Sequence, residues 1–178
     1  TAVPTVASVT SSTSNGTFKV GDTVAVQVKF SEAVVVTTAG GTPKVTLETG
    51  STDRAVNYSS GSESDTLVFN YTVQNGDVAA DLDYTGTTSL ALNGGTIKDV
   101  AGNVATLTPA TPGASGSLAN AKALVVDGAL PAINSGAANG GTKSIALTMS
   151  ENVSGSPDSS DFSVSVGGKP ANQEVRDL

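Results

Sequence analysis

The stretch TVAVQVKF, residues 23–30, indicates the fold class of this chain. Its apolar residues stand at every second position: Val24, Val26, Val28 and Phe30. TLVFNYTV, residues 66–73, has the same alternation, with Leu67, Phe69, Tyr71 and Val73. In an extended strand successive side chains point to opposite faces, so each stretch has one apolar face. The two stretches therefore predict half-buried strands, each with one face inward.

Shorter candidate strands surround these two, at residues 5–10, 44–48, 54–58, 89–92, 95–98 and 122–126. Turn signals such as SNG, ETGS, QNGD and LNGG separate them. Several short strands at this regular spacing favour an all-β protein over a mixed one. The sequence predicts an antiparallel β-sandwich of Greek-key topology.

A possible internal repeat suggests the domain organisation. Pro4 and Pro131 each open a strand-like segment and lie 131 − 4 = 127 positions apart. Ser31-Glu32-Ala33-Val34 and Ser150-Glu151-Asn152-Val153 follow an alternating strand in each half. We therefore expect one sandwich at 1–128 and a partial or shorter second module at 129–178. The second module, with a further alternating stretch at 161–166, has too few strands to stand alone. It is either truncated or completed by pairing with another chain or with the first module.

Composition excludes several classes of function. The 178 residues include no Cys and no His, which rules out disulfides, a thiol nucleophile, a His/Cys zinc site and a Ser-His-Asp triad. The net charge of −7 argues against nucleic acid and anionic membranes as partners. No apolar run approaches the roughly 20 residues of a membrane span, so we expect no membrane insertion. TAVPTVASVT lacks a signal-peptide pattern, so we expect a mature chain or an excerpt of a longer protein. We favour an excerpt, because NQEVRDL at the C-terminus adds no closing element.

The stretch IKDVAGN, residues 97–103, is a candidate calcium site. Asp99 and Asn103 flank a glycine turn at a strand end, Asp127 ends the last strand of the first module, and Glu32 also follows a strand. Calcium takes 6–8 oxygen ligands, and these side chains supply oxygen if the strand ends converge near the linker. The alternative is that Asp99 and Asn103 only stabilise the turn and that Glu32 is a solvated charge.

A second acidic cluster lies in QNGDVAADLDY, residues 74–84. Asp77, Asp81 and Asp83 fall within seven residues, and Asp81 and Asp83 share a face if extended. Like charges this close repel unless a cation or solvent separates them. The alternative is a solvated loop. The chain has few aromatic residues to form a sugar platform beside a carboxylate pair, so we expect no enzymatic activity.

Several sequence segments, which follow one another in this order, resemble those of a known family: FKVGDTVAVQVKFSEAV, LETGSTDRAVNY, LVFNYTVQNGD, LALNGGTIKDVAGN and KALVVDGALP. Residues 1–130 resemble a bacterial Ig-like repeat of very large secreted and cell-surface proteins. The segment after 131 is similar to repeats of the large cyanobacterial cell-surface motility protein and its relatives. The resemblance implies an Ig-like sandwich used as a building block of adhesins, with calcium at or near module junctions.

We therefore expect a structural or adhesive repeat of an extracellular bacterial surface protein, stiffened by calcium. Its partners would be neighbouring repeats of the same protein and a surface glycan or protein target. One alternative is a carbohydrate- or ligand-binding module of a secreted protein. Such a module needs an exposed aromatic platform or a polar groove, and a solvent-exposed Tyr58 or Tyr84 would favour it. Another is a strand-exchanging subunit of a surface fibre, because the second module looks incomplete.

Overall fold

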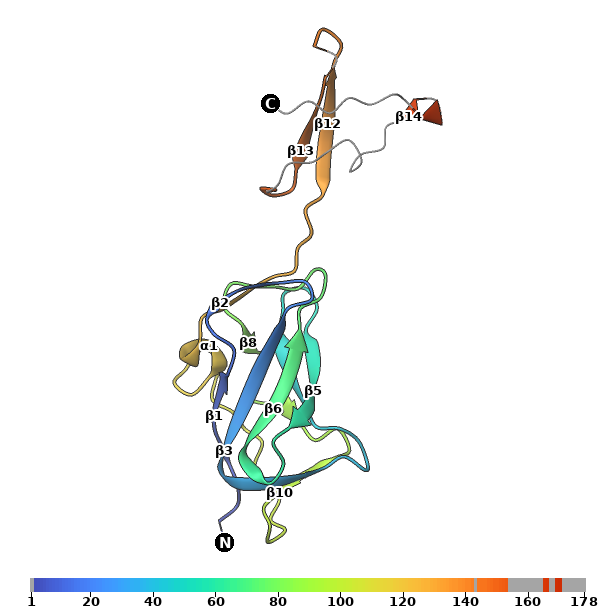
Figure 1. Ribbon diagram of the computed structural model, residues 1–178. Helices are drawn as coiled ribbons and strands as arrows, with labels where there is room; N and C mark the ends of the chain where they lie inside the picture. Colours follow the sequence, from blue (N-terminus) through green and yellow to red (C-terminus); the bar gives the residue numbers. More distant parts are fainter. Residues whose placement is uncertain (1, 143, 154–164, 167–168, 171–178) are drawn as a thin grey trace. The chain divides into compact units, whose positions relative to one another are not determined.

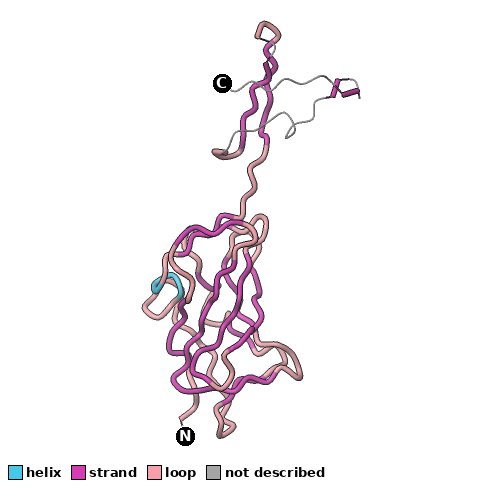
Figure 2. Tube along the Cα trace, in the orientation of Figure 1, coloured by secondary structure: helices cyan, strands magenta, loops and turns pink. Residues whose placement is uncertain are grey.

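Strand β3 (Thr23–Thr37) contains the TVAVQVKF stretch and has a neighbouring strand on each side in the main sheet. In the computed structural model it pairs antiparallel with β1 (Val6–Ser11) on one edge and β6 (Ser64–Thr72) on the other. The alternating residues of β3 and β6 are buried in one core together with those of later strands. The prediction of an all-β sandwich is confirmed, and Figures 1 and 2 show strands throughout this part of the chain.

The main sheet bends at strand β5 (Arg54–Ser60), which pairs with different strands along its length. Tyr58 pairs with Phe69 of β6, whereas Asn57 pairs with Lys44 of β4 (Lys44–Glu48). The sheet then continues to the short strands β8 (Asp83–Tyr84) and β9 (Leu90–Ala91), which both pair with β4. Because the sheet curls, its two halves face each other across the core.

A smaller sheet contains β2 (Gly16–Lys19), β11 (Leu124–Asp127) and β7 (Val78–Ala79). β11 pairs antiparallel with β7 but parallel with β2, so the predicted antiparallel pattern has an exception here. A single-turn helix, α1 (Leu118–Ala121), precedes β11; its N-cap Ser117 accepts a hydrogen bond from the Asn120 N–H. β2, β7 and β8 were not among the predicted strands.

Strand β3 extends beyond the predicted end at residue 30. Its register with β6 shifts between Lys29 and Val34, and the strand continues to Thr37. This last part pairs antiparallel with β10 (Thr96–Lys98). Glu32 therefore lies within an irregular part of the strand rather than after its end.

The structure describes residues 2–142, 144–153, 165–166 and 169–170. The chain divides into two compact units, Thr1–Leu130 (unit 1) and Pro131–Leu178 (unit 2), with the boundary two residues after the predicted one. Unit 2 contains an antiparallel hairpin of β12 (Ile133–Asn139) and β13 (Ser144–Met149), and a short pair, β14 (Ser165–Val166) and β15 (Lys169–Pro170). Residues 161–164 of the predicted strand 161–166 lie outside the described residues. No helix in the described part of the chain is long and apolar enough to cross a bilayer.

Candidate functional site

The first and last residues of unit 1 lie at opposite ends of its sandwich, which are called its N-terminal and C-terminal poles (Figure 1). At the N-terminal pole, the Ser31 N–H donates to the Thr5 carbonyl over 2.9 Å, and the Thr106 N–H donates to the Pro4 carbonyl over 2.8 Å. At the C-terminal pole, the chain leaves β11 at Gly128, which bonds the turn formed by residues 74–77. The strands β1 and β11 therefore connect the two poles to the core.

Asp77 is the centre of the C-terminal pole. One carboxylate oxygen accepts from Arg54 Nε over 2.7 Å and lies 2.7 Å from Arg54 Nη2. The other accepts from the Tyr71 hydroxyl over 2.7 Å and from the Gln74 N–H over 2.9 Å. The Asp77 side chain is only 1% exposed. Its charge is thus compensated inside the protein, and both oxygens are already used.

These contacts also set the protonation state of Asp77. Burial disfavours the charged form, but the Gln74 N–H, the Tyr71 hydroxyl and the Arg54 guanidinium outweigh it and hold the pKa of Asp77 below its ordinary value. Burial and the hydrogen bond to Asp77 raise the pKa of Tyr71. The pole therefore contains a carboxylate, not a carboxylic acid, at neutral pH.

Gly128 joins the end of unit 1 to this cluster through its backbone. Its N–H donates to the Asp77 carbonyl over 2.7 Å, and its carbonyl accepts from the Gly76 N–H over 2.9 Å. A Cβ at position 128 would lie 2.3 Å from the Gln74 carbonyl oxygen and 2.8 Å from that of Asp77. Only glycine permits this approach without a backbone shift, so the last residue before the linker is held closely against the Asp77 turn.

Asp99 and Asn103 form a closed turn at the N-terminal pole. One oxygen of Asp99 accepts from the Asn103 N–H over 2.8 Å, and the other accepts from Asn103 Nδ2 over 2.7 Å. Gly102, with φ of 94°, makes the turn, and its N–H donates to the Asp99 carbonyl. The side-chain bond from Asn103 contributes most to holding the pKa of Asp99 below its ordinary value. The turn-stabilising interpretation accounts for both side chains.

Asp81 and Asp83 do not form the paired carboxylates that their spacing suggested. Asp81 accepts from the Leu124 N–H over 3.1 Å, whereas Asp83 accepts from the Tyr84 N–H and, across the fold, from the Gly113 N–H over 3.0 Å. Each carboxylate therefore holds a different segment. Burial, with a smaller effect of Asp83, raises the pKa of Tyr84 to about 12.

The structure does not bring together the four candidate ligands that were expected to converge near the linker, Glu32, Asp99, Asn103 and Asp127. Glu32, Asp99 and Asn103 belong to the N-terminal pole, while Asp77 and Asp127 belong to the C-terminal pole. Within the described ranges, no three acidic side chains gather closely enough to hold a metal ion. The set therefore does not fit one calcium site near the linker. Glu32 and Asp127 are the two predicted ligands to which the described residues give no protein partner.

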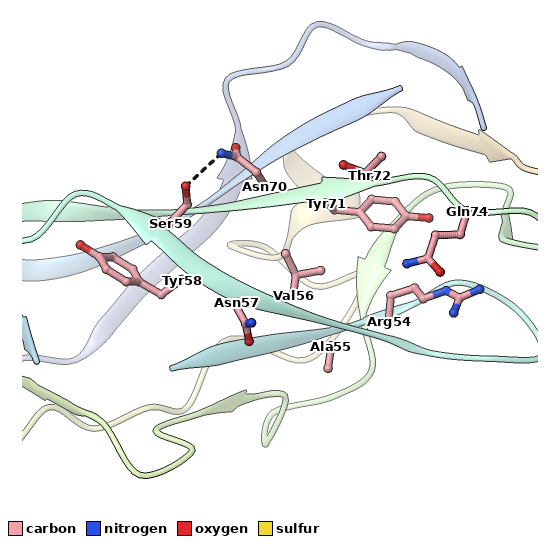
Figure 3. A pocket seen from close by; sticks show the side chains of 10 residues that line it. All are labelled: Arg54, Ala55, Val56, Asn57, Tyr58, Ser59, Asn70, Tyr71, Thr72 and Gln74. Atoms are coloured by element: carbon pink, nitrogen blue, oxygen red, sulfur yellow. Dashed lines mark hydrogen bonds between the residues drawn. The ribbon is translucent and has the colours of Figure 1, made fainter. Parts of the chain in front are cut away.

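An open depression of about 450 Å³ lies where β5 turns away from β6 (Figure 3). Tyr71 and Val56 are among the residues that line it, and so are Asn70 and Ser59, whose side chains are joined by a hydrogen bond of 3.1 Å from Asn70 to Ser59. None of the three tyrosines is exposed: Tyr71 and Tyr84 are buried, and Tyr58 packs edge-on against Phe69 with ring centroids 6.2 Å apart. The depression thus lacks an aromatic platform for a sugar.

The ion pair between Arg54 and Asp77 was not predicted from the sequence. The two residues are 23 positions apart, and only the meeting of β5 with the turn after β6 brings them together. The available signal was Arg54 at the start of a strand otherwise made of small, apolar and neutral residues.

Comparison with family models, curated proteins and solved structures found no match to this chain.

Proposed function

We propose that unit 1 is a spacer repeat of an extracellular bacterial surface protein, either purely structural or part of an adhesin. It would hold another part of that protein away from the cell. Its partners would be neighbouring repeats of the same protein, with a glycan or protein target for the adhesive part. The observation that carries this proposal is the placement of β1 and Gly128 at opposite poles, each bonded into the sandwich.

This placement suits a module that transmits tension. Ladder hydrogen bonds run perpendicular to antiparallel strands. A force applied along β1 at one pole and along β11 at the other therefore loads many of these bonds together rather than one at a time. The buried aromatic side chains give no support to the alternative of a carbohydrate-binding module.

Calcium binding remains part of the proposal, in a form that the geometry allows. Asp127 and Glu32 are carboxylates without a protein partner among the described residues, and they lie on opposite poles. An ion at either residue would complete its 6–8 oxygen ligands with water and nearby backbone carbonyls. Extracellular sites of this kind bind calcium with Kd of about 10⁻⁴–10⁻³ M, so millimolar calcium is the relevant condition.

Single-molecule pulling on the 178-residue chain tests the spacer role. The chain has no cysteine, so Ala2→Cys with Leu130→Cys gives handles at opposite poles of unit 1. Ala2→Cys with Ala39→Cys places both handles on the side of β10 and peels β1 and β3 apart. A spacer requires a clearly higher unfolding force in the first geometry. Equal forces in the two geometries would count against the proposal.

A further inference from the structure

The chain contains four Asn-Gly pairs: Asn15-Gly16, Asn75-Gly76, Asn93-Gly94 and Asn139-Gly140. Such a pair can react with itself, because glycine has no side chain to keep its nitrogen away from the Cγ atom of the preceding asparagine. The glycine nitrogen attacks Cγ, the amide Nδ2 leaves as ammonia, and a succinimide ring forms. Water then opens the ring to aspartate or isoaspartate. The two steps together consume one water and release one ammonia, and they need no enzyme, metal or oxidant.

Two of the four pairs are held in the fold by hydrogen bonds of the asparagine side chain. Asn15 Oδ1 accepts from the Ala123 N–H over 3.2 Å, and the Gly16 N–H donates to the Ala123 carbonyl over 3.1 Å. Asn93 Nδ2 donates to the Thr42 carbonyl over 3.1 Å. Ring formation requires the asparagine side chain to turn toward the next main-chain nitrogen. The reaction is therefore slowed at both pairs by contacts that the side chain would have to break.

Asn75 has none of these side-chain contacts. It is exposed, and the described residues give its amide no protein partner. The Asn139 amide, by contrast, accepts from the Gly141 N–H over 3.0 Å. The restraint on the Asn75 pair acts on the other reacting group, because the Gly76 N–H donates to the Gly128 carbonyl over 2.9 Å. The nitrogen that would attack is thus bound to the residue at which the chain leaves the sandwich.

This bond makes the reactivity of Asn75 depend on the C-terminal pole. An amide N–H that donates a hydrogen bond does not lose its proton until the bond opens, and the same opening controls its hydrogen exchange. Gly128 is bonded to the turn in both directions, since its own N–H donates to the Asp77 carbonyl over 2.7 Å. Opening of the pole, by thermal motion or by force, therefore frees the Gly76 nitrogen.

We propose that Asn75 is a self-modification site, at which deamidation is blocked while Gly128 bonds Gly76 and proceeds when the C-terminal pole opens. The only co-reactant is solvent water. This inference goes beyond the proposed function and does not depend on it, because the pole also opens without any applied force.

The modification would make the opening permanent. The turn is closed by the Asp77 N–H, which donates to the Gln74 carbonyl over 3.1 Å, and by the Gln74 N–H, which donates to Asp77 Oδ2 over 2.9 Å. Isoaspartate at position 75 adds one atom to the main chain between these two residues, so both bonds cannot keep their geometry. The new carboxylate also lies in the same turn as the Asp77 carboxylate, and like charges this close repel.

Deamidation rates measured site by site in the 178-residue chain test the proposal. The parent, Gly128→Ala and Gly86→Ala are incubated at pH 8, and tandem mass spectrometry quantifies the products at Asn15, Asn75 and Asn93. We expect Gly128→Ala to react at Asn75 about two- to tenfold faster than the parent, the range that corresponds to one lost hydrogen bond. The rates at Asn15 and Asn93 should not change. Gly86→Ala should match the parent at all three sites, because a Cβ at Gly86 meets nothing within 4 Å.

A peptide of residues 72–79 supplies the unprotected rate of the same Asn-Gly pair. Asn75 should react at least about tenfold more slowly in the folded parent than in the peptide. If Gly128→Ala unfolds unit 1, all sites accelerate together, and the peptide comparison decides. Equal rates in peptide and parent, or an unchanged Asn75 rate in folded Gly128→Ala, would overturn the proposal.

Asn75→Gln tests the effect of the modification on the pole. Glutamine must close a larger ring and deamidates more slowly, so this variant should keep its Tm during an incubation in which the Tm of the parent falls. An equal fall in both proteins would contradict the claim that modification at position 75 weakens the turn. The pulling experiment does not measure deamidation, so this proposal and the spacer proposal fail separately.

Discussion

Arg54 and Asp77 form an ion pair, 2.7 Å between Nη2 and Oδ1, that joins the corner strand β5 to the turn holding the end of unit 1. The Asp77 side chain is almost fully buried and Arg54 largely so. The pair therefore links the bend of the main sheet at β5 to the turn that bonds Gly128. A pulling force on the C-terminal end of unit 1 would act at this turn.

Removing the Asp77 carboxylate should destabilise unit 1 strongly. Breaking a buried ion pair by removing one partner costs about 3–5 kcal/mol, since the remaining charge and donors are left uncompensated. We expect Asp77→Ala to lower the free energy of unfolding in urea by about 3 kcal/mol, the lower end, because Arg54 reaches solvent in part. Asp53→Asn, an exposed charge on the neighbouring loop, is the matched control and should change the free energy by less than about 0.5 kcal/mol. Equal effects would contradict the account of the pole.

The pH dependence of stability should report the same carboxylate. The pKa of Asp77 is lowered in the folded protein, so its contribution is fully present above the unfolded pKa of about 3.9 and is lost as pH falls through the folded value. Unfolding free energies of wild type and Asp77→Asn, measured from pH 7 down to 2, should therefore converge below about pH 4. Curves that stay parallel over this range would show that Asp77 is not stabilised as an anion.

Substitution of Gly128 should disturb the last contact before the linker. The added methyl group of Gly128→Ala meets two carbonyl oxygens of the Asp77 turn, and overpacking of this kind costs about 1–3 kcal/mol. Gly86→Ala is the control, because a Cβ at Gly86 meets nothing within 4 Å. Thermal unfolding should show a lower Tm for the first variant and little change for the second. Hydrogen exchange of the Gly76 amide, which donates to Gly128, should accelerate only in Gly128→Ala.

The effect of calcium on the Tm should distinguish a carboxylate that bonds other protein groups, such as Asp99, from Glu32 and Asp127, which have no protein partner among the described residues. If calcium binds at Glu32 or Asp127, millimolar calcium raises the Tm relative to chelator, and Glu32→Gln or Asp127→Asn reduces that rise. Asp99→Ala should lower the Tm by a similar amount with and without calcium, because its oxygens bind Asn103. A calcium-dependent effect confined to Asp99→Ala would instead make the IKDVAGN turn a metal site.

Local patterns predicted much of this structure. The alternation in residues 23–30 and 66–73 located the two central strands, because burial of one face imposes a period of two. The turn interpretation of Asp99 and Asn103 needed only the five residues 99–103 of sequence. The ion pair of Arg54 with Asp77 could not be predicted, since it depends on how β5 changes partners from β6 to β4. The separation of Asp99 from Asp127 likewise depends on the path of the whole chain between the two poles.

The most direct test of the spacer account is the unfolding force of the Asp77→Ala variant pulled through Ala2→Cys and Leu130→Cys handles. The account predicts a clear drop in force relative to the parent with the same handles, because the C-terminal pole no longer holds Gly128 firmly. With handles at Ala2→Cys and Ala39→Cys, the same substitution should have a smaller effect, since β1 and β3 separate at the other pole. An unchanged force in the first geometry would contradict the claim that the Asp77 cluster carries tension through unit 1.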